Sequence, residues 1–282
     1  MTTVTPPSDK FSLEKISGDK MYHWVVDENL QSGQAKKFAS MIANGMSVVL
    51  PTQVGYILPA ATEKALDKMF ELKGRPKTKA GVVLLPRVVN LESFAQTTDD
   101  IRHLYAHAEK DDTLLGCILP HNQNFPSFVP EGCLEMMSDG RSTSCFVTRY
   151  GTPSEQVVQA LWDNHKIVCF ASSANPSGKG NRGELAYVGE KILTGVDAIM
   201  EGDFYVHGCQ PQATAETRAE QGVMVSFVDE DGSLMNIKDN KPRIIRHGHQ
   251  LEKVKALLQE HFGGYVDAHG EHQNVYLHGA TA

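Results

Sequence analysis

A cluster of polar side chains follows an apolar run in the middle of the chain. The run Ile167–Ala171 is typical of a buried strand, and the next residues are Ser173-Ala174-Asn175-Pro176-Ser177-Gly178. Lys179 and Arg182 follow shortly after. In α/β folds, ligands bind at the carboxyl ends of strands. Hydroxyls, a carboxamide and two cations at such an end suit a phosphate-bearing ligand.

Two more cations lie at the end of a predicted helix, in Glu71-Leu72-Lys73-Gly74-Arg75-Pro76. Position alone leaves two interpretations open. The pair complements the helix dipole in a solvated last turn, or it clamps an anion. Gly74 would let both side chains approach one ligand.

Polar residues also follow two other predicted strands. Thr52 and Tyr56 come after Ser47–Leu50, and Arg149 comes after Cys145–Thr148. Each of these signals is weak alone, because turn and surface residues of these types are common at strand ends. Their order along the chain is what makes them informative.

The elements that must position these residues alternate between helix and strand. Thr62 is a predicted N-cap, and Thr152-Pro153-Ser154-Glu155 has the pattern of a capping box. Alternating strands and helices predict an α/β sheet. Helices are expected over 35–45, 63–72, 99–108 and 152–162, and strands over 47–50, 82–85, 167–171 and 197–200. Beyond residue 200 we expect an irregular loop over 201–221, a hairpin over 223–237 and a last helix from Leu251.

The bulk composition limits the class of protein. We expect a flexible lead-in over 1–20, one domain over 21–262 and a Gly- and His-rich tail over 263–282. Within the domain, the core motifs span 35–200 and a C-terminal extension spans 201–262. The formal net charge of −7 argues against a broad nucleic-acid surface. Scattered cysteines and the absence of a long apolar run predict a cytoplasmic protein without a membrane span.

No metal site is predicted from the histidines. His103 and His107 are four residues apart on a predicted helix, but no third ligand is evident. His261, His269, His272 and His278 are irregularly spaced near the end of the chain. Surface positions are the simpler interpretation for both groups.

Taken in order, the motifs resemble the YrdC/Sua5 family, the L-threonylcarbamoyladenylate synthases of tRNA modification and their paralogues. The resemblance spans about residues 35–200 and is strongest at Phe70–Pro76 and Ser173–Gly178. It implies a YrdC-like twisted mixed sheet with flanking helices around a concave basic cavity.

The resemblance also implies roles for individual residues. The Lys-Arg pair and the Ser-x-Asn pair form the family's ATP-binding tetrad. The implied ATP contacts are Lys73, Arg75, Ser173 and Asn175, with Arg149 and Arg182 as further contacts. Lys73 and Arg75 would also be catalytic, and Thr52, Tyr56 and Ser177 would line the small-substrate end.

The implied reaction uses threonine, bicarbonate and ATP as substrates, with Mg²⁺ bound to the triphosphate. The carboxylate of N-carboxythreonine attacks the α-phosphorus, pyrophosphate leaves, and a partner enzyme passes the threonylcarbamoyl group to tRNA. Such a reaction depends mainly on positioning and on neutralising phosphate charge. Contact with tRNA would then be indirect.

The first motif departs from the family pattern Pro-Thr-(Asp/Glu)-(Thr/Ala)-Val-(Tyr/Phe)-Gly-Leu. Gln53 stands where the acid is usual, and Gly55 and Ile57 also differ. These changes predict a divergent paralogue that uses a different amine, with bicarbonate or carbamoyl phosphate as donor. A non-catalytic nucleotide or RNA binder is the other alternative. Ser226 is a weak candidate for a nucleotide contact, and Arg243–Gly248 resembles the family's closing Leu-Arg-x-Gly segment.

Overall fold

The structure is a computed structural model that describes residues 11–24, 28–77, 80–214 and 216–270. Its strands form one mixed sheet of eleven strands in the order β1-β8-β2-β3-β7-β4-β6-β5-β9-β10-β11. The strands are β1 (Met21–His23), β2 (Val48–Thr52), β3 (Gly55–Ala60), β4 (Val82–Leu84), β5 (Leu115–Pro120), β6 (Thr143–Thr148), β7 (Cys169–Ser173), β8 (Ala198–Glu201), β9 (Val223–Ser226), β10 (Arg243–Arg246) and β11 (Val266–Asp267).

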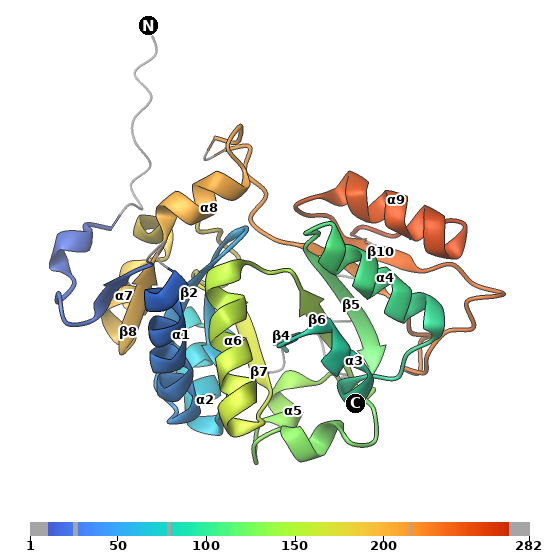
Figure 1. Ribbon diagram of the computed structural model, residues 1–282, viewed down its shortest axis with the longest axis horizontal. Helices are drawn as coiled ribbons and strands as arrows, with labels where there is room; N and C mark the ends of the chain where they lie inside the picture. The colour runs from blue at the N-terminus through green and yellow to red at the C-terminus, as the bar shows by residue number, and fades with distance from the viewer. Residues whose placement is uncertain (1–10, 25–27, 78–79, 215, 271–282) are drawn as a thin grey trace, which may run out of the picture.

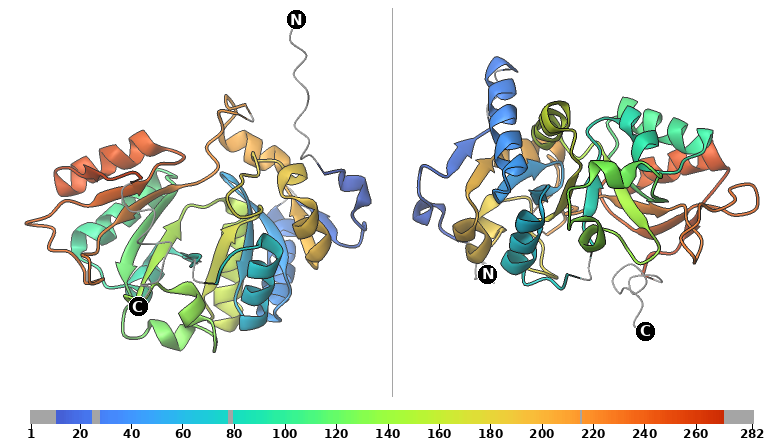
Figure 2. Two further views of the ribbon diagram at one scale, coloured as in Figure 1. Left: turned by 180° about the vertical axis from the view of Figure 1, so that it is seen from behind. Right: turned by 90° about the horizontal axis from the view of Figure 1, so that it is seen from below.

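Helices flank this sheet, as the α/β prediction required (Figure 1). They are α1 (Glu28–Ala43), α2 (Glu63–Lys73), α3 (Leu91–Phe94), α4 (Asp99–Lys110), α5 (Leu134–Met137), α6 (Thr152–His165), α7 (Glu190–Gly195), α8 (Asp203–Cys209) and α9 (Leu251–Phe262). Residues 11–24 and α8 lie toward the opposite end of the molecule from α9 (Figure 2). None of the helices in the described ranges is long and apolar enough to cross a bilayer.

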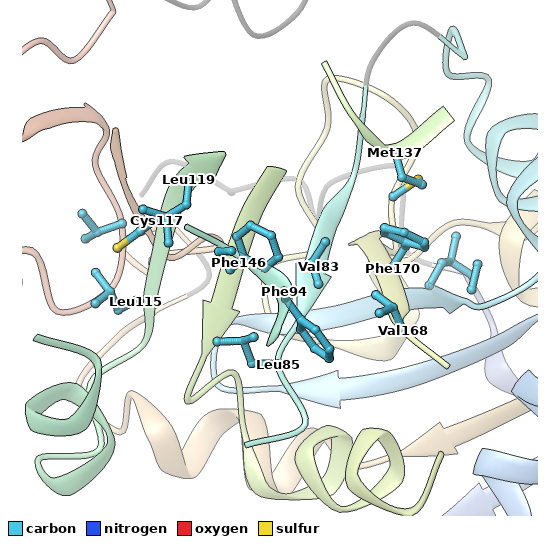
Figure 3. Close-up of a cluster of buried hydrophobic side chains, with 14 of the residues drawn as sticks. Val83, Leu85, Phe94, Leu115, Cys117, Leu119, Met137, Phe146, Val168 and Phe170 are labelled. Carbon is cyan, nitrogen blue, oxygen red and sulfur yellow. The ribbon is translucent and has the colours of Figure 1, made fainter. Parts of the chain in front are cut away.

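The central strands separate a packed core from a cavity because side chains alternate along a strand. Val83, Phe146 and Phe170 come from the neighbouring strands β4, β6 and β7, and they pack in one cluster with Phe94 (Figure 3). On β5, the odd-numbered residues of Leu115–Leu119 point into this core. The even-numbered ones face the cavity described below.

The two predicted caps have different outcomes. Thr62 caps α2, since its hydroxyl accepts a bond of 3.2 Å from the Ala65 N–H. Thr152 is instead the first residue of α6, and the N-cap is Gly151, with φ 127°. The Thr152 N–H donates to the Tyr205 hydroxyl at 2.9 Å. The start of α6 is therefore capped by the distant Tyr205 together with the local Glu155, whose Oε1 accepts from the Gly151 N–H at 3.4 Å.

The C-terminal third is more regular than expected. Helix α8 lies inside the predicted loop 201–221, where only Val206 of the helix is buried and little periodicity is visible. The predicted hairpin is reduced to one bridge between Val228 and Leu234, because β9 pairs with β10 instead. Within the predicted tail, β11 pairs with β10 and Ala268 is fully buried, so residues to about 268 belong to the fold.

The predicted lead-in is also partly attached to the fold. The Phe11 N–H donates to the Ala186 carbonyl at 2.9 Å, and Lys20 Nζ donates to the Val196 carbonyl at 3.1 Å. Residues 1–10 of the lead-in and 271–282 of the tail lie outside the described residues.

Candidate functional site

A cavity of about 980 Å³ lies against the sheet. Alternate residues of the central strands form its floor, which is largely apolar. Three segments form its polar rim, namely 172–180, 218–222 and 245–248. The floor residues from β4, β5 and β6 include Val82, Leu84, Gly116, Ile118, Cys145 and Val147.

Lys73 joins the helix end to the segment after β7. It is the last residue of α2 and only 3% exposed. Its Nζ donates to the main-chain oxygen of Asn175 at 2.7 Å and to that of Ser173. The Lys73 carbonyl in turn accepts a bond of 3.0 Å from the Ser177 N–H. The structure therefore brings together the lysine and the Ser-x-Asn pair that lie 100 residues apart in sequence.

A Schellman turn ends α2 and directs these side chains. Gly74 adopts a left-handed conformation with φ 58°, and the Arg75 N–H donates to the Phe70 carbonyl at 3.0 Å. Arg75 then reaches the Ser172 hydroxyl at 3.3 Å and the Ala80 carbonyl at 2.6 Å. Burial lowers the pKa of Arg75 to about 10, so the guanidinium stays charged at neutral pH.

The segment after β7 is fixed by a buried amide. Asn181 Nδ2 donates to the Tyr56 carbonyl at 3.1 Å, and its Oδ1 accepts from the Gly183 N–H at 3.2 Å. Gly55 has φ 134°, and a Cβ there would lie 2.1 Å from Asn181 Oδ1. Glycine at position 55, one of the departures in the first motif, therefore leaves the space that Asn181 occupies.

Thr52 and Tyr56 both line the cavity, but their hydroxyls form hydrogen bonds with other residues of the protein. Thr52 Oγ1 donates to the Gly55 carbonyl at 2.9 Å. The Tyr56 hydroxyl donates to Asp203 Oδ1 at 2.5 Å and accepts from the Gly202 N–H at 3.0 Å. Burial and the Asp203 carboxylate raise the pKa of Tyr56 far above its usual value. Both hydroxyls are therefore bonded to partners within the protein.

Gln53 is buried and does not line the cavity. Its Nε2 donates to the Arg149 carbonyl at 2.9 Å and to Asp112 Oδ1 at 3.3 Å. A carboxylate at position 53 would face the Asp112 carboxylate and could not donate these bonds. Glutamine at position 53 therefore suits this site better than the usual acid, because its amide can donate to both Asp112 and the Arg149 carbonyl.

Arg149 and Arg182 do not line this cavity. Arg149 is held between two carboxylates, with Nε 2.8 Å from Asp112 Oδ1 and a terminal nitrogen 2.9 Å from Glu155 Oε2. Arg182 lies over the Tyr187 ring at 4.9 Å and lines a separate pocket of about 400 Å³. The family resemblance implies ATP contacts for both arginines, whereas in this structure both lie outside the lining of the large cavity.

The lining of the large cavity is nevertheless basic, as predicted. The lining residues described here include five cations, namely Lys73, Arg75, Lys179, Arg218 and Arg246, and two acids, namely Asp139 and Glu220. Asp139 is also paired with Arg141 at 2.6 Å. A protein with an overall charge of −7 thus carries a locally cationic site.

Comparison with known proteins gives the family. The Sua5/YciO/YrdC family, described as "Telomere recombination", matches residues 40–213. The chain belongs to this family. A hypothetical protein from Streptococcus mutans is 35% identical, with a TM-score of 0.79 over 90% of this chain and 100% of that one. No curated protein sequence matches the chain.

Two more distant members of the fold have bound ligands. P. abyssi Sua5 complexed with L-threonine is 18% identical, with a TM-score of 0.58 over 88% of this chain and 62% of that one. Full-length HypF in its phosphate- and nucleotide-bound form is 14% identical, with a TM-score of 0.54 over 79% of this chain and 25% of that one. At these identities the likeness shows a shared fold.

The lining residues of this Sua5/YciO/YrdC member that were not predicted as site residues include Arg218, Arg246 and His247. Arg218 is 8% exposed and donates to the Val206 carbonyl at 3.0 Å. Arg246 Nε donates to the Gly222 carbonyl at 3.1 Å, and burial lowers its pKa. His247 Nε2 lies 2.8 Å from Asp267 Oδ1. The likeness of 243–248 to the closing family segment was the available signal for the last two. Ser226 is buried and does not line the cavity.

Proposed function

We propose that this protein binds ATP in the large cavity and transfers the adenylyl group to the carboxylate of a small carbamate, releasing pyrophosphate. One observation carries the proposal. In a Sua5/YciO/YrdC member, buried Lys73 holds the main chain at Ser173 and Asn175 against a basic cavity, with Arg75 beside it.

The cavity suits a nucleotide in size and in charge. Its volume of about 980 Å³ is at the upper end of the range for small-molecule sites, roughly 300–1,000 Å³. Its cations come from separate segments and surround one space, which favours a ligand with several anionic groups. The nucleotide-bound HypF structure and the threonine-bound Sua5 structure, which share the fold, support the same assignment.

The chemistry requires anions to approach each other. A carbamate oxygen attacks the α-phosphorus of ATP, a new P–O bond forms, and the bond to the pyrophosphate oxygen breaks. Lys73 and Arg75 would neutralise phosphate charge as it shifts toward the leaving group. Ser173 and Asn175 would orient phosphate and ribose oxygens, and Ser177 would contact the small substrate. Mg²⁺ would neutralise further phosphate charge, and the lining carboxylate of Glu220 offers the kind of oxygen donor that this ion prefers.

The amine that carries the carbamate is proposed to differ from threonine. Near the first motif, the cavity is lined by Val54 and Ile57, while the Thr52 and Tyr56 hydroxyls are bonded within the protein. A substrate hydroxyl would have few partners there, and an apolar side chain would bury its surface favourably. The product adenylate would pass to a separate transferase, so tRNA would be involved only indirectly.

Pyrophosphate release tests the proposal. Purified protein with ATP, Mg²⁺ and bicarbonate is assayed against a panel of amino acids, and separately against carbamoyl phosphate. We expect release with a non-threonine amine, and strong loss of release in Lys73→Met. Lys68→Met is the matched control, because Lys68 lies on the same helix with 39% of its side chain exposed.

The other outcomes separate the alternatives. Release with threonine alone contradicts the altered amine but keeps the reaction. ATP binding without release under any condition points to a nucleotide-binding module. Salt-dependent RNA binding without ATP binding would favour the RNA binder and overturn the proposal.

A further inference from the structure

Three side chains of metal-ligand type meet where α4 and α9 lie side by side, away from the proposed site (Figure 1). His107 comes from α4, and Glu260 and His261 come from α9. His107 Nδ1 lies 3.2 Å from His261 Nε2 and 3.7 Å from Glu260 Oε1. All three ligand atoms lie within 4.8 Å of one another.

The separation of the two histidine nitrogens matches an edge of a metal coordination shell. Two imidazole nitrogens bound to tetrahedral Zn²⁺ at about 2.0–2.1 Å are about 3.3 Å apart. The two histidine nitrogens here differ from that by about a tenth of an ångström. Glu260 Oε1, at 3.7 Å from His107 Nδ1, would have to move closer to reach the same ion.

A second carboxylate orients the first histidine. His107 Nε2 lies 3.3 Å from Asp111 Oδ2, one turn further along α4. Histidines that bind metals usually donate their other ring N–H to a carboxylate, which leaves the ligating nitrogen unprotonated. With its proton on Nε2, His107 directs the lone pair of Nδ1 toward His261 and Glu260.

The ring of His261 stands edge-on to that of His107, with centroids 5.4 Å apart and planes at 87°. The two nitrogens that face each other, His107 Nδ1 and His261 Nε2, belong to rings on two different helices.

We propose that His107 Nδ1, His261 Nε2 and a carboxylate oxygen of Glu260 bind one Zn²⁺ or similar divalent transition metal, with water completing the shell. The ion would clamp α9 to α4. Helix α9 directly follows the segment 245–248 that lines the large cavity, so the clamp would stabilise the C-terminal part of that wall. The sequence did not predict this site because the two histidines lie 154 residues apart.

Metal titration of the full chain tests the site directly. Protein freed of metal by chelation is titrated with Zn²⁺ by calorimetry and with Co²⁺ by visible absorption. We expect one tight equivalent, Co²⁺ bands typical of a four- or five-coordinate site, and a rise in melting temperature with Zn²⁺. His107→Ala, Glu260→Ala and His261→Ala should each remove the bands and weaken Zn²⁺ binding at least 10-fold. Asp111→Asn should weaken it about 10- to 100-fold.

The histidines near the C-terminus provide the control. The double variant His272→Ala, His278→Ala should bind the ion as the wild type does. The proposal is overturned if this double variant removes the tight equivalent, if His107→Ala and His261→Ala leave it unchanged, or if the wild type binds none. In the last case the two imidazoles simply share a proton. None of these readouts depends on ATP or on pyrophosphate release, so they are independent of the proposed function.

Discussion

Replacing Lys73 by methionine tests how the site is held together. Methionine keeps most of the buried volume of the side chain but removes the ammonium group. The main-chain oxygens of Ser173 and Asn175 then lose the donor that holds the segment after β7 against α2. The substitution should therefore lower both the stability of the fold and the affinity for ATP.

The expected size follows from the two lost bonds. A buried carbonyl that loses its partner costs about 1–3 kcal/mol, so two cost about 2–6 kcal/mol. The variant no longer buries an ammonium, which offsets part of this cost. We expect a net loss of about 2–4 kcal/mol, or about 4–8 °C in melting temperature for a chain of this size. Loss of one charged contact to phosphate would weaken ATP binding about 10- to 100-fold.

Thermal unfolding and ATP titration of the folded protein measure the two effects separately. Lys68→Met, on the exposed side of the same helix, should change stability by less than about 0.5 kcal/mol and leave ATP binding intact. Wild-type melting temperature and ATP affinity in Lys73→Met would refute the reasoning. A lower melting temperature with unchanged ATP affinity would make Lys73 a purely structural residue.

Three further substitutions, and a fourth that serves as a control, test other parts of the site. Arg149→Ala should leave ATP affinity within about 3-fold, because Arg149 lies outside the cavity lining. It should lower stability by about 1–3 kcal/mol, because the largely buried Glu155 loses its cation. A large loss of ATP affinity would show that Arg149 does contact the nucleotide. Gly55→Ala should lower the free energy of unfolding by about 2–4 kcal/mol, because the added Cβ would collide with Asn181. The control Gly178→Ala should lower it by only about 1 kcal/mol, since Gly178 has φ 81° but open space around it. Equal losses in urea unfolding would contradict this. Tyr56→Phe should destabilise the fold by about 1–3 kcal/mol at pH 7 and by less near pH 4. Burial raises the pKa of Asp203 and the Tyr56 bond lowers it, so the lost bond matters most once Asp203 is ionised, and a pH-independent cost would contradict the assignment.

Local signals in the sequence predicted much of the fold and the part of the site that lies at the ends of α2 and β7. Helices with a clear apolar stripe, such as α4 with Ile101, Leu104, Tyr105 and Ala108 buried, were predicted where they occur. Helix α8, with a single buried residue, offered no such stripe and was missed. The polar residues at the ends of α2 and β7 were predicted because turn residues at strand and helix ends form a local pattern in the sequence.

The tertiary structure alone decided which charges share a space. Arg149 and Arg182 resembled phosphate ligands in the sequence, yet Asp112 and Glu155 hold the first and the Tyr187 ring packs against the second. Arg218 and Arg246 reach the cavity only because β9 and β10 extend the sheet beside β5. The clustering of His107 with His261 likewise depends on the packing of α4 against α9. A sequence determines which groups are available and which local turns present them. Distances between groups a hundred residues apart are set by strand order and helix packing, which no local pattern encodes.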